Sequence, residues 1–115
     1  MRRFNGLIGI EQGTKILFSD FVHDGAMWTG SGPREVRQKE VFKEAFVAPP
    51  SVTVGISMWD IDHKTNSRVD ISAENVSATG FEIVFRTWAD TRIARIRADW
   101  LAIGPARDED DWDVT

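Results

Sequence analysis

A strict alternation of apolar and polar residues restricts the fold of this sequence more than any other feature. It is clearest at 51–59, where every second residue is apolar: Val52, Val54, Ile56 and Met58. Because successive side chains of a strand point to opposite faces, this pattern predicts a strand with one buried face. The alternation recurs in three later segments, with these residues predicted to face inward: Val69, Ile71 and Ala73 in 68–73; Phe81, Ile83 and Phe85 in 81–88; Ala94, Ile96, Ala98, Trp100 and Ala102 in 92–103.

The first half of the chain is less regular. Phe4–Ile10 and Glu35–Phe46 are predicted as strands, and Asp24–Pro33 as a glycine-rich loop. No window sustains a helical period, and Val, Ile, Thr and Phe are concentrated in the predicted strands. We therefore predict an all-β fold, a compact antiparallel β-sandwich of about six strands, over residues 1–106.

Charge and cysteine content exclude several classes of protein. The chain of 115 residues has no cysteine, which excludes disulfides and thiolate metal sites. Five of its 18 acidic residues stand in Asp108–Asp113, and 13 acidic residues remain against 14 basic ones. The body is thus nearly neutral and lacks the basic surface that nucleic-acid binding needs. Residues 107–115 are predicted to form an acidic, disordered tail.

No segment of the sequence predicts insertion into a membrane. The start, Met-Arg-Arg-Phe-Asn-Gly, has no apolar run of the signal-peptide kind, and no later run is long enough to span a bilayer. We expect a soluble protein with no membrane partner. Its compartment stays open between the cytoplasm and export by a non-classical route.

The outward residues of the last two predicted strands mix charged and apolar side chains. The charged residues are Glu82, Arg86, Arg95, Arg97 and Asp99, and the apolar residues are Val84, Ile93, Leu101 and Ile103. One interpretation is a solvated face with weak ion pairs. The alternative, which the apolar residues favour, is a subunit interface in which the charges pair between chains.

Five pieces of sequence stand in order between Phe46 and Gly104. They are Phe46–Asp60 with its Pro-Pro pair, Asn66–Arg68 ahead of the 69–75 strand, Gly80-Phe81, Thr87-Trp88-Ala-Asp-Thr91 and Trp100–Gly104. In this order and spacing they resemble the H-type lectin domain of snail agglutinins and discoidins. The resemblance is loose over Glu11–Phe42 and absent in the acidic tail.

The resemblance implies a six-stranded antiparallel sandwich that assembles as a homotrimer, paired into a hexamer in some members. It also implies a lectin and not an enzyme. The partner would be a glycan, with a sugar like N-acetylgalactosamine or galactose bound in the cleft between adjacent subunits. No cofactor and no metal is expected.

Two residues match sugar-contacting positions of that family. Trp88 matches its binding-site tryptophan, and an aromatic plate at a strand end suits the apolar face of a sugar ring. Arg68 matches its arginine, whose guanidinium donates to ring hydroxyls. The alternatives are an interface tryptophan and a surface arginine paired with an aspartate: Asp60, Asp62 or Asp70.

The remaining candidate site residues depart from the family pattern. Ser31 stands where the snail lectins have an acidic acceptor, and Asp24 and Asp90 are the nearby acids that we add to the candidate carbohydrate site. The family's histidine after the tryptophan is Ala89, and a later tyrosine is Ala94. These changes leave the sugar specificity open.

Other constellations give weaker hypotheses. Asp60, Asp62 and His63, with His23 and Asp24, contain ligand types that suit a metal ion, but turns use the same residues. Trp28 and Trp59 lie near predicted loops, where each could line a groove or lie in an interface or the core. The sequence Thr-Gly-Ser-Gly-Pro around Ser31 lacks the strand-to-helix context of a nucleophile elbow.

The sequence is therefore compatible with three functions. The first is a sugar-binding trimer. The second is a structural or receptor-contact module of a larger particle, with the same fold and no affinity for sugar. The third is a metal-dependent enzyme built around Asp60, Asp62 and His63.

Overall fold

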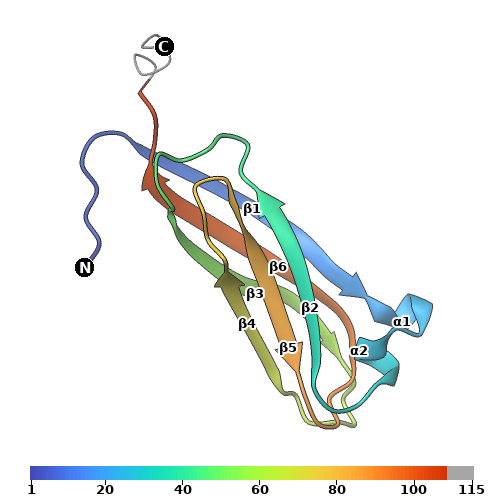
Figure 1. The fold of residues 1–115 in the computed structure, drawn as a ribbon. Helices are drawn as coiled ribbons and strands as arrows, with labels where there is room; N and C mark the ends of the chain where they lie inside the picture. The colour runs from blue at the N-terminus through green and yellow to red at the C-terminus, as the bar shows by residue number, and fades with distance from the viewer. Residues whose placement is uncertain (109–115) are drawn as a thin grey trace.

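The computed structural model describes residues 1–108 and consists almost wholly of strands (Figure 1). Two single-turn helices lie between the first strand and the second. In chain order the elements are β1 (Ile8–Ser19), α1 (Asp20–His23), α2 (Ala26–Thr29), β2 (Arg34–Val41), β3 (Ser51–Ile61), β4 (Val69–Glu74), β5 (Gly80–Thr87) and β6 (Ile93–Pro105).

The strands form two three-stranded sheets that face each other. One sheet has the order β1-β6-β3 and the other the order β2-β5-β4, and every neighbouring pair is antiparallel. The predicted all-β antiparallel sandwich of six strands is confirmed. Each sheet is centred on one of the two late strands, β5 or β6, whose alternation is strong in the sequence.

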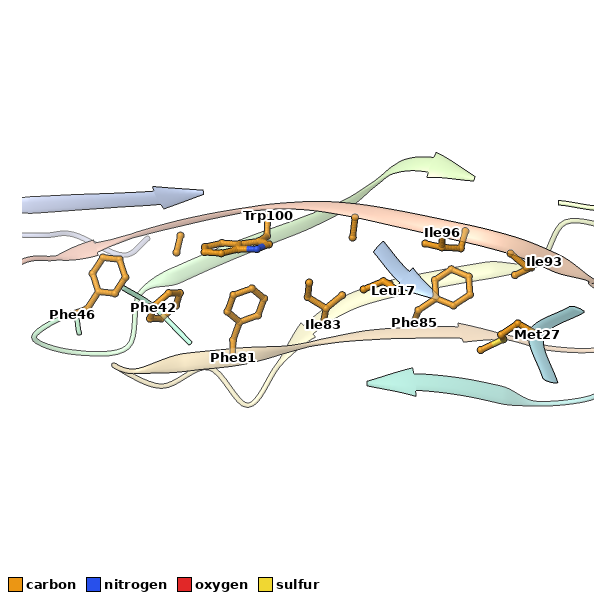
Figure 2. Packing of buried hydrophobic residues seen from close by; sticks show 12 residues of the cluster. Leu17, Met27, Phe42, Phe46, Phe81, Ile83, Phe85, Ile93, Ile96 and Trp100 are labelled. Atoms are coloured by element: carbon orange, nitrogen blue, oxygen red, sulfur yellow. The ribbon is translucent and has the colours of Figure 1, made fainter. Parts of the chain in front are cut away.

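The core lies between the sheets, and Figure 2 shows its side chains pointing inward from both layers. The predicted inward residues of β5 and β6 are buried there. Toward one end, Trp100 contacts Phe81 and Phe42 at ring centroid distances of 5.2 and 6.0 Å, and Phe46 joins Phe42 at 5.0 Å. Such aromatic packing stabilises a sandwich beyond the area that it buries.

The first strand lies elsewhere than predicted. The strand expected at Phe4–Ile10 begins at Ile8 and continues to Ser19. Its alternation is inverted, because glycine and charged residues face the core whereas Ile10 and Ile16 face outward. Gly13 pairs with Trp100, and a Cβ at Gly13 would lie 2.7 Å from that ring. The inward glycine therefore makes room for the tryptophan.

The second predicted strand, Glu35–Phe46, is also shorter than expected. It ends at Val41, after which Phe42 and Phe46 leave the sheet and enter the core. Their backbone N–H groups donate to Thr79 and Ala78 across the β4–β5 turn. The loop predicted at Asp24–Pro33 contains α2, whose single turn is too short to show a period in the sequence.

The prediction that the last two strands share one charged outer face is wrong. β5 and β6 belong to different sheets, so Glu82 and Arg86 lie on the opposite outer face from Arg95, Arg97 and Asp99. Ile93 is fully buried, because a register shift at the start of β6 turns it inward. Val84 is buried as well, within the β2-β5-β4 sheet.

Arg86 and Arg37 form ion pairs within one chain on the outer face of that sheet. Arg86 pairs with Glu35 and Glu74 at 2.9 Å, and Arg37 pairs with both of these glutamates and with Glu82. These charges therefore have partners without a second protomer. Within residues 1–108, no helix is long and apolar enough to cross a membrane. The acidic tail predicted at 107–115 lies, from residue 109 onward, outside the described residues.

Candidate functional site

Three connections meet at the end of the sandwich that lies away from the N-terminus (Figure 1). They are the β5–β6 turn at 88–92, the β3–β4 connection at 62–68 and the segment from α1 to β2. Asp62 donates its N–H to the Arg92 carbonyl, and Gly32 donates to Ala89, both at 2.9 Å. The three segments are thus joined through their backbones.

Two buried threonines hold Arg68 beside the β5–β6 turn: Thr87 directly precedes the turn and Thr91 lies within it. The Thr87 hydroxyl donates to the Arg68 carbonyl at 2.5 Å. The Thr91 hydroxyl donates to the Asn66 carbonyl at 2.5 Å and accepts the Arg68 N–H at 3.1 Å. Since both threonines are buried, these bonds fix the backbone of Arg68 relative to the turn.

The side chain of Arg68 pairs with Asp90 in the same turn. Arg68 Nη1 lies 2.7 Å from Asp90 Oδ1. The backbone N–H of Asn66 donates to the other carboxylate oxygen, and this bond, with the charge of Arg68, lowers the pKa of Asp90. The aspartate partners considered from the sequence, Asp60, Asp62 and Asp70, are not the residue that Arg68 contacts. The pair presents donors and an ionised acceptor at the surface.

Trp88 lies between this pair and β2. Thr87 pairs with Arg34 on one side and Val69 on the other, so the next residue, Trp88, stands between the two flanks. Its side chain is 42% exposed. It borders a groove of about 370 Å³, whose lining is Pro33, Arg34, Glu35, Arg86, Thr87 and Trp88.

Arg34 connects the loop before β2 with the turn after Trp88 through side-chain hydrogen bonds. Its guanidinium donates to the carbonyls of Gly32 at 2.9 Å and of Met27 and Ala89 at 3.3 Å. Ala89 has a left-handed backbone (φ 60°), which is unfavourable for a residue with a side chain. Two donors on the Ala89 carbonyl, Gly32 N–H and Arg34, hold this conformation and with it the position of Trp88.

The structure brings only some of the predicted site residues together. Arg68 and Asp90 form an ion pair, and Trp88 follows Thr87, whose register partner Val69 follows Arg68, so we refer to Arg68, Trp88 and Asp90 as a row. Ser31 is adjacent in the chain to Gly32, which is bonded to the turn. Asp24 lies at the end of α1 with a φ of 50°, and within residues 1–108 no hydrogen bond or ion pair joins its carboxylate to the row. Ala94 is buried, so that position adds nothing to the surface.

The two other tryptophans considered near loops differ in their surroundings. Trp28 packs against Phe21 at 5.1 Å, and the guanidinium of Arg92 covers its ring at 4.7 Å. Trp59 is exposed on β3, in the other sheet from Trp88. Trp28 is therefore already covered, and Trp59 lies apart from the row of Arg68, Trp88 and Asp90.

The weaker hypotheses receive little support from the described part of the chain. In residues 1–108, no group of three or more His, Cys, Asp or Glu side chains is placed to hold a metal ion. Asp62 pairs with Arg92 at 3.7 Å. A second hollow of about 300 Å³ lies near the β4–β5 turn, but its one aromatic residue, Phe81, is buried in the core.

Comparison with known proteins assigns the family. The profile of the H-type lectin domain matches residues 37–103, which is more than half of the chain. The chain belongs to the H-type lectin family. The resemblance seen in the sequence is thereby confirmed, and a lectin domain indicates carbohydrate binding as the class of function.

Relatives of this H-type lectin domain differ in length. The protein named ATP synthase subunits region ORF 7, of Fuscovulum blasticum, is 61% identical over 114 residues, 99% of each chain. A discoidin-1 chain of Dictyostelium discoideum is 35% identical over 78 residues, and the match covers 67% of this chain and 31% of that one. The chain thus corresponds to about a third of the discoidins.

Solved structures agree on the fold. The native structure of recombinant discoidin II of Dictyostelium discoideum superimposes with a TM-score of 0.74 at 20% sequence identity. The match covers 84% of this chain and 37% of that chain. At this identity the likeness concerns the fold alone.

Sequence reasoning missed several residues of the site. Thr87 and Thr91 were noted as part of a turn, but their hydroxyls had no assigned role. Arg34, which bonds the loop to the turn, was not considered, nor were Glu35 and Arg86, which line the groove beside the site. The spacing of the threonines on either side of Trp88 was the available signal, whereas the clamp by Arg34 depends on contacts between distant segments.

Proposed function

We propose that this chain is a carbohydrate-binding module whose site is formed by Trp88, Arg68 and Asp90, and that it is not an enzyme. One observation carries the proposal: an exposed tryptophan stands beside an arginine–aspartate pair whose backbone is fixed by two buried hydroxyls. The family supports a sugar as the ligand. Ser31 and Asp24 are proposed to complete the site from the adjoining loop.

The chemistry of these side chains suits a pyranose. One face of a sugar ring carries C–H groups that pack on an indole, and its hydroxyls each donate and accept hydrogen bonds. Arg68 supplies donors and Asp90 supplies a charged acceptor, which is the stronger kind. Asp90 would supply the charged acceptor that the Ser31 hydroxyl cannot, and we propose a galactose-like or N-acetylgalactosamine-like ligand.

The functional form is proposed to be a homotrimer that uses the outer face of the β1-β6-β3 sheet. This face exposes the apolar side chains of Ile8, Ile10, Ile16 and Leu101. It carries the ion pair of Arg95 with Asp60, whereas the larger network around Arg86 occupies the opposite face. Exposed apolar patches on a soluble domain mark association. The 62–68 and 88–92 connections, which hold the site, run from one sheet to the other at the end of the sandwich. We therefore propose that the site adjoins this interface and that the sugar binds at the clefts between subunits, as the family resemblance implies.

A glycan-array screen of the purified oligomer tests the proposal. We expect selective binding that Trp88→Ala and Arg68→Ala both abolish. Phe21→Ala is the matched control, because Phe21 is an exposed aromatic residue at the same end of the sandwich but contacts Trp28. The Phe21→Ala variant should bind the same glycans as strongly as the unchanged protein.

The alternative function predicts a different result. A structural or receptor-contact module would form a stable oligomer that binds no glycan on the array. The replacement of the family's histidine by Ala89 is the observation that favours it. That result would contradict the lectin proposal and leave Trp88 as a contact residue.

A further inference from the structure

Trp88 has a donor–acceptor pair on each side, and only one of them belongs to the site proposed above. On the β4 side stands Arg68 with Asp90. On the β2 side the groove of about 370 Å³ contains Glu35 and Arg86, with Glu35 Oε1 2.9 Å from Arg86 Nε. This volume is within the ~300–1,000 Å³ that small-ligand clefts occupy.

The groove combines an apolar wall with accessible hydrogen-bonding groups. Trp88 and Pro33 provide the apolar lining. The side chains of Glu35 and Arg86 are 40% and 37% exposed, so both can still contact a ligand. A carboxylate oxygen accepts more than one hydrogen bond, and a guanidinium has five N–H donors. Adjacent hydroxyls of a sugar need both kinds of partner.

The charge of the groove favours a neutral ligand. Arg34 also lines it, but its guanidinium is directed to backbone carbonyls of Gly32, Met27 and Ala89. Its positive charge and that of Arg86 are offset by Glu35 in the groove and by Glu74, which pairs with Arg86 from outside the groove. An acidic sugar would meet the Glu35 carboxylate without an unpaired cation to compensate.

We infer that this groove is a second sugar subsite, which takes a neutral pyranose next to the one held by Trp88, Arg68 and Asp90. The inference rests on the proposed function, since the two subsites share Trp88. It specifies the ligand further: a neutral disaccharide or longer glycan that extends across Trp88 from the β4 flank to the β2 flank.

Titration calorimetry with methyl galactoside and neutral galactosyl disaccharides of different linkage tests the subsite. We expect one or more disaccharides to bind about tenfold tighter than methyl galactoside, which is about 1.4 kcal/mol. Glu35→Ala should remove this gain and leave the affinity for methyl galactoside unchanged. A galactosyl-glucuronate disaccharide should bind more weakly than its neutral galactosyl-glucose counterpart.

Glu74→Ala is the matched control. Glu74 contacts the same two arginines as Glu35, with distances of 2.9 Å to Arg86 and 3.3 Å to Arg37, but it does not line the groove. The Glu74→Ala variant should therefore still bind the disaccharide more tightly than methyl galactoside, by the same factor as the unchanged protein. Loss of the gain in both variants would assign the effect to the ion-pair network and overturn the subsite.

The remaining outcomes separate the subsite from the proposed function. If methyl galactoside binds but no disaccharide binds more tightly, or the gain survives Glu35→Ala, the subsite is overturned and the lectin function stands. Tighter binding of the acidic disaccharide overturns its neutral specificity. If a folded oligomer binds neither methyl galactoside nor any disaccharide, both proposals fail.

Discussion

The hydroxyls of Thr87 and Thr91 determine where Arg68 stands relative to Trp88. Three hydrogen bonds, to and from the backbone of residues 66 and 68, run through these two buried side chains. Removing a buried donor leaves its acceptor unpaired, which costs more than the bond itself contributes. The geometry of the exposed row therefore depends on two buried hydroxyls.

Thr91→Val should lower both stability and glycan affinity. Valine keeps the shape of the side chain but leaves the Asn66 carbonyl and the Arg68 N–H without their partner, at a cost of about 1–3 kcal/mol in the free energy of unfolding. Thr91→Ser keeps the hydroxyl and should retain affinity. Urea unfolding and calorimetric titration measure the two effects, and an equal loss of affinity in both variants would contradict the positioning role.

The pH dependence of binding should follow Asp90. Its pKa is lowered in the folded protein, first by the Asn66 N–H and further by the charge of Arg68. The carboxylate thus stays ionised as the pH falls through the ordinary aspartate value of about 3.9, and the stability that it contributes is lost only below that value.

Affinity should accordingly stay constant from pH 7 to about pH 5, where an ordinary aspartate is also ionised. It should fall only in the acid range in which Asp90 is protonated. Asp90→Asn should bind more weakly at neutral pH and lose this acid-side dependence. A decline of affinity near pH 6 in the unchanged protein, measured by titration at several pH values, would assign the dependence to another group.

Sequence reasoning proposed Arg68, Trp88 and Asp90 for one site, and the structure shows that Arg68 and Asp90 pair, because these residues lie in one short stretch and its strand partner. It could not place Asp24 relative to them, since the helical turns between β1 and β2 are too short to leave a pattern. The Arg34 clamp and the Glu35–Arg86 groove arise from pairing between β2 and β5, which are far apart in the chain. Local spacing carries no information on such pairing.

At the scale of the elements, β1 is a strand whose bounds the sequence pattern did not predict correctly. The strands β3 to β6 place apolar residues inward and were predicted nearly to their ends. β1 places Gly9 and Gly13 inward, against Phe46 and Trp100, and its isoleucines outward. The proposed trimer accounts for this pattern, because it would cover the outward isoleucines while the core covers the other face.

Gly13→Ala should destabilise the fold. The new methyl group would lie 2.7 Å from three atoms of the Trp100 ring, so the aromatic cluster must shift, at a cost of about 1–3 kcal/mol. Gly55→Ala is the control in the same sheet, because a Cβ there meets nothing within 4 Å. Thermal unfolding should show a lower Tm for the first variant and no decrease for the second. Equal effects would contradict the close packing of β1 on Trp100.

At the scale of the whole molecule, the two outer faces differ in kind. The β2-β5-β4 face carries ion pairs that are complete within one chain, and the β1-β6-β3 face exposes isoleucines. The sequence predicted a mixed face because β5 and β6 adjoin in the chain and have the same alternation. Only the sheet order, which places them in opposite layers, separates Glu82 and Arg86 from the apolar patch, whose own face also carries Arg95, Arg97 and Asp99.

Ile10→Lys should dissociate the oligomer. Ile10 is 67% exposed on the apolar face, and a buried lysine without a partner disfavours association. Val41→Lys is the control: Val41 is 76% exposed but lies at the end of β2 in the other sheet. Sedimentation velocity should give the mass of one chain for Ile10→Lys and of three for Val41→Lys. A trimer in both variants would place the interface elsewhere.

The central claim, that sugar binds at Trp88, can be tested by nuclear magnetic resonance of the tryptophan indole N–H groups. The chain has five tryptophans, and single Trp→Phe variants assign their signals. On titration with methyl galactoside or N-acetylgalactosamine, we predict that the Trp88 signal shifts with saturation while those of the buried Trp100 and the covered Trp28 stay in place. An unmoved Trp88 signal at millimolar sugar, or a shift confined to another tryptophan, would contradict the account.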